Sequence, residues 1–148
     1  MSDDEAGSTS DASPVSDWNT KIIVEFRANQ GRVGGSFEGA PMLLLRTRGA
    51  KSGAERVNPM MYLEDAGKRY VFASKAGADT NPDWFHNLVA NPDVTVEVGR
   101  DTIKATAVPV DGTERDRIFT IQKERYPGFA EYEAKTSRVI PVVELRRI

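Results

Sequence analysis

The stretch RTRGAKSGAERVNP, residues 46–59, contains the residue types and spacing that most favour ligand chemistry. Its turn is marked by Gly49 and Gly53, and glycine lets the backbone adopt positive φ and approach a ligand closely. Consecutive N–H groups in such a turn can form a concavity that binds anions. Four cations here accompany a single anion: Arg46, Arg48, Lys51, Arg56 and Glu55. The stretch predicts a cradle for a phosphate or polycarboxylate, and a solvated basic hairpin is the alternative.

A second loop of small residues, SKAGADT at 74–80, follows an apolar stretch and leads into a helix start. We expect the two loops to be neighbours, so that their cations can hold one anionic tail through charge-assisted hydrogen bonds. Four large apolar side chains near these loops could form a flat wall for an aromatic ring, with core packing as the alternative: Met60, Met61, Trp84 and Phe85. Together these features favour a large, flat cofactor with an acidic tail.

The composition argues against several other chemistries. The chain has no cysteine, which excludes disulfides, thiol catalysis and thiolate metal sites. Its one histidine, His86, has no second histidine with which to share a metal and no evident serine triad, so we expect a surface or supporting role and no metal site. The sequence shows neither a dinucleotide fingerprint after a strand nor a P-loop pattern. Cofactor binding is the chemistry that remains.

Length and charge favour one globular domain. The chain has 148 residues and a formal net charge of −2, and residues 1–14 hold four acids and no base, which predicts a disordered acidic leader. Residues 15–148 then carry a formal charge of +2, too small for a general nucleic-acid binder. The sequence has neither an apolar run near 18 residues nor the apolar core of a signal peptide, so we expect a cytoplasmic protein.

Residues 16–29 show apolar side chains at helical spacing, namely Trp18, Ile22, Ile23 and Phe26. We expect this helix to dock on the core. The alternative is contact with the inner face of a membrane, or a cover over the substrate.

The rest of the chain predicts about six short antiparallel strands interrupted by helices. Strands are expected at 42–45, 56–63, 70–74, 94–98, 102–110 and 139–145. A helix is expected from Pro82, capped by Asn81, and another from a capping box formed by Thr113 and Asp116. The pattern is mainly β with flanking helices (α+β), typical of a small barrel with helices packed outside.

Two runs carry a family resemblance: GAKSGAERVNP at 49–59 and ASKAGADTNPDWFHNL at 73–88. They resemble the signature of the deazaflavin-dependent nitroreductase family, and the likeness extends from about Asn19 to the C-terminus. The resemblance implies a split β-barrel, FMN-binding-like, that binds coenzyme F420, a 5-deazaflavin carrying a phosphate and a glutamate tail. Residues 15–148 would then form a single deazaflavin-binding domain.

The resemblance also implies which residues contact the cofactor. The phosphate and tail would lie at Ala50, Lys51, Ser52 and Arg56, although Ala50 stands where members often carry a further basic residue. A strand would run along the cofactor through Val57, Asn58, Pro59, Met60 and Met61. The other side would be lined by Phe72, Ala73, Ser74, Lys75, Asp83, Trp84, Phe85, His86 and Asn87.

The acceptor end is expected around Ser74, which could polarise the acceptor or guide a proton, with a water-relayed proton as the alternative. Tyr126, Phe129 and Tyr132 match positions where the family places aromatic groups over the substrate pocket. Phe129 stands where the nitro-reducing members have a tyrosine, so nitro reduction is less expected than cofactor binding, because losing a hydrogen-bonding group changes selectivity strongly.

These observations predict an oxidoreductase that passes hydride from reduced F420 to an electron-poor acceptor such as a quinone, an enone or a nitroaromatic. The alternatives are an FMN-binding flavoprotein of the same barrel, a non-catalytic F420 carrier, and a peripheral membrane protein that reads lipid. The oligomeric state is not predicted.

Overall fold

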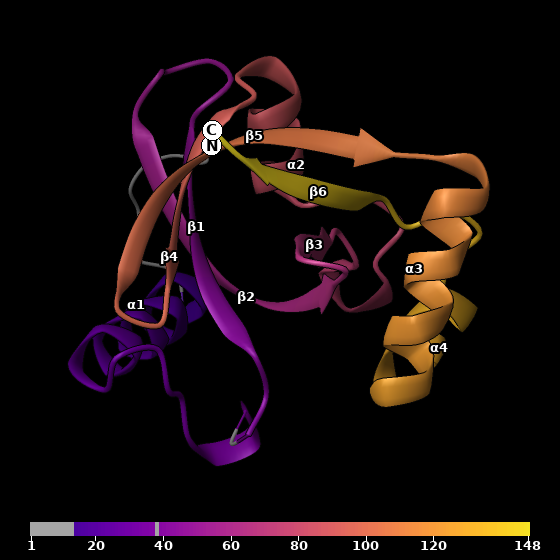
Figure 1. Cartoon of the computed structure of the whole chain (residues 1–148), viewed down its shortest axis with the longest axis horizontal. Helices are drawn as coiled ribbons and strands as arrows, with labels where there is room; N and C mark the ends of the chain where they lie inside the picture. The colour runs from indigo at the N-terminus through magenta and orange to yellow at the C-terminus, as the bar shows by residue number, and fades with distance from the viewer. Residues whose placement is uncertain (1–13, 38) are drawn as a thin grey trace.

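The computed structural model describes residues 14–37 and 39–148, and the strands within this part close into an antiparallel barrel (Figure 1). The order around the barrel is β1-β2-β3-β6-β5-β4. The strands are β1 Met42–Arg48, β2 Glu55–Asp65, β3 Lys68–Phe72, β4 Asp93–Val98, β5 Asp101–Val110 and β6 Val142–Arg147. The helices are α1 Pro14–Ala28, α2 Asp83–Ala90, α3 Gly112–Arg125 and α4 Gly128–Ala134, with short 3-10 turns η2 Gly35–Phe37 and η3 Lys75–Gly77.

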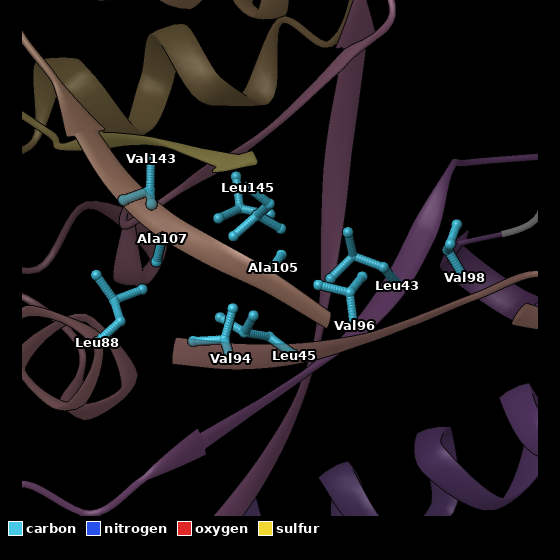
Figure 2. Packing of buried hydrophobic residues seen from close by; sticks show 11 residues of the cluster. Leu43, Leu45, Leu88, Val94, Val96, Val98, Ala105, Ala107, Val143 and Leu145 are labelled. Atoms are coloured by element: carbon cyan, nitrogen blue, oxygen red, sulfur yellow. The ribbon is translucent and has the colours of Figure 1, made fainter. Parts of the chain in front are cut away.

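The barrel interior is filled by alternating aliphatic side chains. In β4, Val94, Val96 and Val98 are buried, while Thr95 and Glu97 between them are partly exposed. Because successive side chains of a strand point to opposite faces, this alternation directs one face of each strand inward. Leu88 of α2 joins the same cluster, and Figure 2 shows it beside Ala107 and Val94. Helix α2 therefore closes one end of the barrel.

The outward face of β1 explains where α1 docks. Met42 and Leu44 are buried together with Ile22 and Phe26 of α1 and with Val33. The apolar run at 42–45 is thus buried on both faces, and core docking of the N-terminal helix is confirmed. The predicted leader, residues 1–14, lies outside the described residues except for Pro14, which begins α1.

Helices α3 and α4 lie on the other side of the barrel from α1 (Figure 1). They cover a second apolar cluster, which is formed by Leu63, Tyr70, Phe72, Ile118, Phe119, Phe129, Ile140 and Val142. The predicted fold class is confirmed.

Three local predictions were wrong. Helix α3 begins at Gly112 with Asp111 as its N-cap, so Thr113 lies inside the first turn and cannot cap it, and the Asp116 carboxylate accepts from Arg115 at 3.1 Å. Helix α2 begins one residue late, at Asp83, since the Asn81 side chain accepts from Arg138 and does not cap the helix. The last strand begins at Val142, directly after a proline that lacks a donor N–H, and not at 139.

Candidate cofactor-binding site

One edge of β2 is only partly paired. Residues Glu55–Met61 of β2 pair with β1, whereas pairing with β3 begins only at Tyr62. At about 3.3 Å per residue, the stretch 55–61 presents an edge roughly 20 Å long on the side facing away from β1. Strands β1 and β3 are both antiparallel to β2, so the loops that follow them leave the barrel at the same end. The two predicted loops therefore lie toward one end, joined by this edge.

The turn between β1 and β2 is closed by its own backbone. Gly49 N–H donates to the Ala54 carbonyl at 2.8 Å and Gly53 N–H to the Gly49 carbonyl at 2.9 Å. Gly53 adopts φ of +71°, which favours glycine. Within residues 14–37 and 39–148, the N–H groups of Lys51 and Ser52 form no hydrogen bond. The exposed tip of the turn therefore offers two backbone donors to a ligand.

The four cations of this stretch have different environments. Arg46 donates to the Glu55 carboxylate at 3.2 Å and lies 3.7 Å from Glu97, which also pairs with Arg27 at 2.6 Å. The hydrogen bond from Arg27 holds the pKa of Glu97 below its usual range. Arg46 thus belongs to an ion-pair network.

The other three cations lie at the turn or beside it. Arg48 donates to the Gly53 carbonyl at 3.4 Å. Lys51 is exposed, and Arg56 is opposite Thr47 in the register, so both Arg56 and Thr47 lie on one face of the hairpin. Lys51 thus lies at the exposed tip of the turn, and Arg56 lies on the strand that follows it.

Helix α2 is tied to the turn by Asn87. The Asn87 side-chain oxygen accepts from Ala50 N–H at 3.0 Å, and its nitrogen donates to the Thr47 hydroxyl at 3.5 Å. Asn87 is 9% exposed, so this residue links two elements and offers little surface to a ligand. On the same helix Trp84 and Phe85 are partly buried against the barrel cluster, whereas Asp83 and His86 are exposed.

The second loop has an unusual backbone. Ser74 lies in the right-handed helical region, with φ −76° and ψ −35°, and Lys75, Ala76 and Gly77 follow with φ of 47°, 53° and 83°. A right-handed residue followed by a left-handed one forms a nest, in which successive N–H groups line an anion-binding concavity. Non-glycine residues at positive φ cost roughly 1–3 kcal/mol each and cluster at functional sites.

The hydrogen bonds of this loop agree with a nest. Gly77 N–H donates to the Ser74 carbonyl at 2.9 Å and Ala78 N–H to the Lys75 carbonyl at 3.0 Å, which closes the turn. In the described part of the chain, the N–H groups of Ser74, Lys75 and Ala76 donate to no acceptor. The loop therefore offers three consecutive donors beside the Lys75 ammonium, which contacts the Thr80 hydroxyl at 3.2 Å.

Arg138 supports this loop and was missed in the sequence. Its guanidinium donates to the carbonyls of Ala73, Ser74 and Ala78 and to the Asn81 side chain, at 2.8–3.1 Å. Burial lowers its pKa from the usual value. These partners lie 57–65 residues away in the chain, so no local pattern marks Arg138 as part of the site.

The aromatic residues predicted near the acceptor lie beside the second loop. Helix α4 packs on η3 so closely that a side chain at Gly77 would lie 2.8 Å from the Tyr132 carbonyl. Phe129 is 8% exposed, and its ring meets those of Phe72 at 5.7 Å and Tyr132 at 5.3 Å between centroids. Phe72 and Phe129 are packed in the cluster, whereas Tyr126 and Tyr132 keep partly exposed surface.

Strand alternation divides the predicted residues of β2 between two faces. Met60 packs toward the barrel interior, and Arg56 and Asn58 share its face. Val57 and Met61 pack toward the α1 cluster, and Pro59 shares their face. The side chains of Val57 and Met61 are therefore used in packing. What remains accessible to a ligand along this stretch is the edge of the strand.

The described residues contain no group of three or more histidine or acidic side chains placed to hold a metal ion. None of their helices combines the length and apolar composition needed to cross a bilayer.

The barrel is antiparallel, its β2 strand pairs with β3 only from Tyr62 onward, and two loops with unbonded backbone donors lie at one end, and these features define the class as a split-barrel protein. Residues 19–146 match the family model described as F420H(2)-dependent quinone reductase. An F420H(2)-dependent quinone reductase of Mycobacterium tuberculosis is 40% identical over 126 residues, covering 82% of this chain and 85% of that protein.

Solved structures agree with this match. One described as an F420-H2 dependent reductase is 41% identical with a TM-score of 0.66, over 72% of this chain and 94% of that one. Another, described as a domain-swapped dimer, is 38% identical with a TM-score of 0.68, over 90% of this chain and all of that one. The chain belongs to the F420H(2)-dependent quinone reductase family.

Family membership makes the chain an oxidoreductase whose cofactor is reduced coenzyme F420. The predictions of family, fold, enzyme class and cofactor are confirmed, and those of the individual site residues stay predictions. The described residues fit the cofactor, because unbonded N–H groups and cations at both loops suit its phosphate and carboxylates.

Proposed function

We propose that the chain binds F420 along the open edge of β2 and passes its hydride to a quinone. The observation that carries this proposal is the pair of loops with unbonded backbone donors, at 51–52 and 74–76, at the same end of the barrel. Reduced F420 supplies the hydride when it is bound, and the residues of the chain bind it, orient it and exclude water.

In this proposal the β1–β2 turn holds the phosphate and the acidic tail. Lys51 and Arg56 supply positive charge, and Ser52 supplies a hydroxyl and an N–H group. The nest at Ser74–Ala76 faces the ring end, where its N–H groups stabilise negative charge on a ring or acceptor oxygen. Trp84 and Phe85 offer apolar surface for the ring, and the partly exposed Tyr126 and Tyr132 shape the acceptor pocket.

A fluorescence titration with F420 tests the turn. Lys51→Ala and Arg56→Ala should each lose about 1.5–3 kcal/mol of binding free energy, or roughly ten- to a hundredfold in Kd, if each makes a charge-assisted contact. Lys104→Ala is the matched control, because Lys104 is an exposed cation on β5, opposite β2 in the barrel order. Unchanged affinity in both turn variants would reject the cradle.

Two other functions have distinct outcomes. An FMN-binding flavoprotein would bind FMN tightly and show no response to F420 in the same titration. A carrier would bind reduced F420 without consuming it when a panel of quinones is added, which absorbance at the cofactor band records. Turnover with a quinone excludes the carrier.

Membrane contact through α1 is a further prediction, motivated by Trp18 at 49% and Val24 at 61% exposure. Liposome flotation of wild type and of a Trp18→Ala, Val24→Glu double variant tests it. Phe26 is unsuitable for substitution because it is 1% exposed and belongs to the core. Absence of flotation would reject membrane contact, and equal flotation of both proteins would reject a contact made through Trp18 and Val24.

A further inference from the structure

We infer that Arg138 is the positioning residue that orients the backbone donors of the Ser74–Ala76 nest toward the cofactor. The inference rests on the proposed function of that loop. Arg138 lies between α4 and β6, and its side chain reaches the loop that connects β3 to α2. The residue makes no contact with the reacting atoms in this inference, and acts through the peptide groups that it holds.

The contacts form a fork across the loop. Nε donates to the Ala78 carbonyl at 2.8 Å, and one terminal nitrogen donates to the Ala73 carbonyl at 3.1 Å and the Asn81 side chain at 2.8 Å. The other terminal nitrogen donates to the Ser74 carbonyl at 2.8 Å. A planar guanidinium can reach acceptors on several sides at once, whereas the single ammonium of lysine cannot reproduce this pattern.

The geometry of the peptide group sets the direction of each N–H group once the carbonyl of the same peptide is held. The described residues contain no cis peptide bond, and in a trans peptide the C=O and N–H groups point in opposite directions. Because Arg138 holds the carbonyls of Ala73 and Ser74, the N–H groups of Ser74 and Lys75 must point to the opposite side of the loop. These are two of the three donors that form the nest.

The charge of Arg138 strengthens the same donors. A hydrogen bond from a cation polarises the carbonyl that accepts it, and chains of hydrogen-bonded dipoles reinforce one another in a low-dielectric setting. Arg138 is partly buried, so water screens its field less than it would at the surface. The guanidinium therefore places positive potential behind the two peptides whose N–H groups face the ligand.

The loop needs this support because its conformation is strained. Lys75 and Ala76 both adopt positive φ without being glycine. Two other contacts hold the loop from the α4 side: the Thr136 hydroxyl donates to Asp79 at 3.0 Å, and Gly77 packs against Tyr132. Neither contact touches the carbonyls of residues 73 and 74. Among the described side chains, Arg138 is the one that donates to these two carbonyls.

The test compares Arg138→Gln and Arg138→Lys with Arg115→Gln. Arg115 is a matched control, because it is 9% exposed and donates twice to the Ile140 carbonyl, at 3.0 and 3.1 Å, without touching the loop. Amide exchange of Gly77 and Ala78 is measured by NMR without cofactor, and F420 affinity is measured by fluorescence. We expect faster exchange at both amides and about a tenfold to hundredfold rise in Kd for both Arg138 variants.

The control should leave F420 affinity within about twofold of wild type even if its Tm falls as far as that of Arg138→Gln. Faster exchange with unchanged affinity in the Arg138 variants would overturn the inference, as would an equal loss of affinity in Arg115→Gln. If Arg138→Gln fails to fold, Asn81→Ala removes one acceptor of the fork, and unchanged exchange and affinity in that variant overturn the inference. A wild-type chain that does not bind F420 would reject the proposed function instead, since the exchange measurement needs no cofactor.

Discussion

The Asn87→Ala substitution tests how the β1–β2 turn is held in place. Asn87 is the side chain that connects α2 to this turn, through Ala50 N–H at 3.0 Å and the Thr47 hydroxyl at 3.5 Å. The first bond has ordinary geometry, and the second is at the limit of hydrogen-bond distance. Alanine removes both hydrogen bonds and leaves the helix backbone intact.

The loss of stability in Asn87→Ala depends on how exposed the two partners of Asn87 are. Ala50 is exposed, so water can replace the lost acceptor, and the net cost is about 1 kcal/mol. Thr47 is 1% exposed, so its hydroxyl loses a partner that water cannot easily replace, which costs about another 1 kcal/mol. Since 1 kcal/mol lowers the Tm of a domain of this size by roughly 2–4 °C, the variant should melt about 4–8 °C below wild type.

The assay is thermal unfolding without cofactor, followed by F420 titration of the folded variant. Thr47→Val is the control, because it removes only the long hydrogen bond and keeps the side-chain shape. We expect Thr47→Val to melt closer to wild type than Asn87→Ala does, and to bind F420 normally. A Tm for Asn87→Ala within 1 °C of wild type, or equal losses in both variants, would refute the estimate.

Three further variants probe the rest of the fold. Burial, and then the hydrogen bond to Glu114, raise the pKa of Tyr70 from 10.0 to about 12, so its stabilisation is complete below pH 10 and is lost as pH rises through about 12. Wild type should therefore lose on the order of 2 kcal/mol of folding free energy over this pH range. Tyr70→Phe has no hydroxyl to titrate, so its alkaline denaturation curve should lack this loss. The hydrogen bond from Arg27 lowers the pKa of Glu97, so Glu97→Gln should be about 1 kcal/mol less stable than wild type at neutral pH. In urea unfolding, this difference should disappear as the pH falls below 4.5, the usual pKa of a glutamate. Gln122 is fully buried, and its amide atoms have no partner among the described residues, so Gln122→Met should raise the Tm by a few degrees, and a lower Tm would contradict this.

The barrel was predictable because its determinants are local. Alternation along 94–98 and the continuous apolar run at 42–45 depend only on the period of a strand and on which faces are buried. The interior and exterior residues of the structure follow from that period. The order of the six strands does not, because β3 pairs with β6 across about 70 residues, and no short pattern encodes that pairing.

The two loops of the candidate site were predictable as loops for a similar reason. Glycine and cation spacing marks the β1–β2 turn, and a proline after a small-residue loop marks the start of α2. Contacts between distant segments were not predictable: Arg46 belongs to a network with Glu97, and Arg138 holds a loop about 60 residues earlier. The left-handed conformation of Lys75 and Ala76 was also missed, because these residue types do not favour positive φ and tertiary contacts impose it.

Helix α2 connects the two loops of the proposed site. Its first residue, Asp83, follows the second loop directly, and Asn87 one turn later holds the first loop. At 1.5 Å per residue, these anchor points lie about 6 Å apart along the helix axis. Helix α2 packs against the barrel through Leu88, so the segment that follows the second loop and the side chain that holds the first loop belong to one short, anchored element. In the proposed site, a ligand that reaches both loops runs along the edge of β2 at residues 55–61, roughly 20 Å long, which a single free phosphate cannot span.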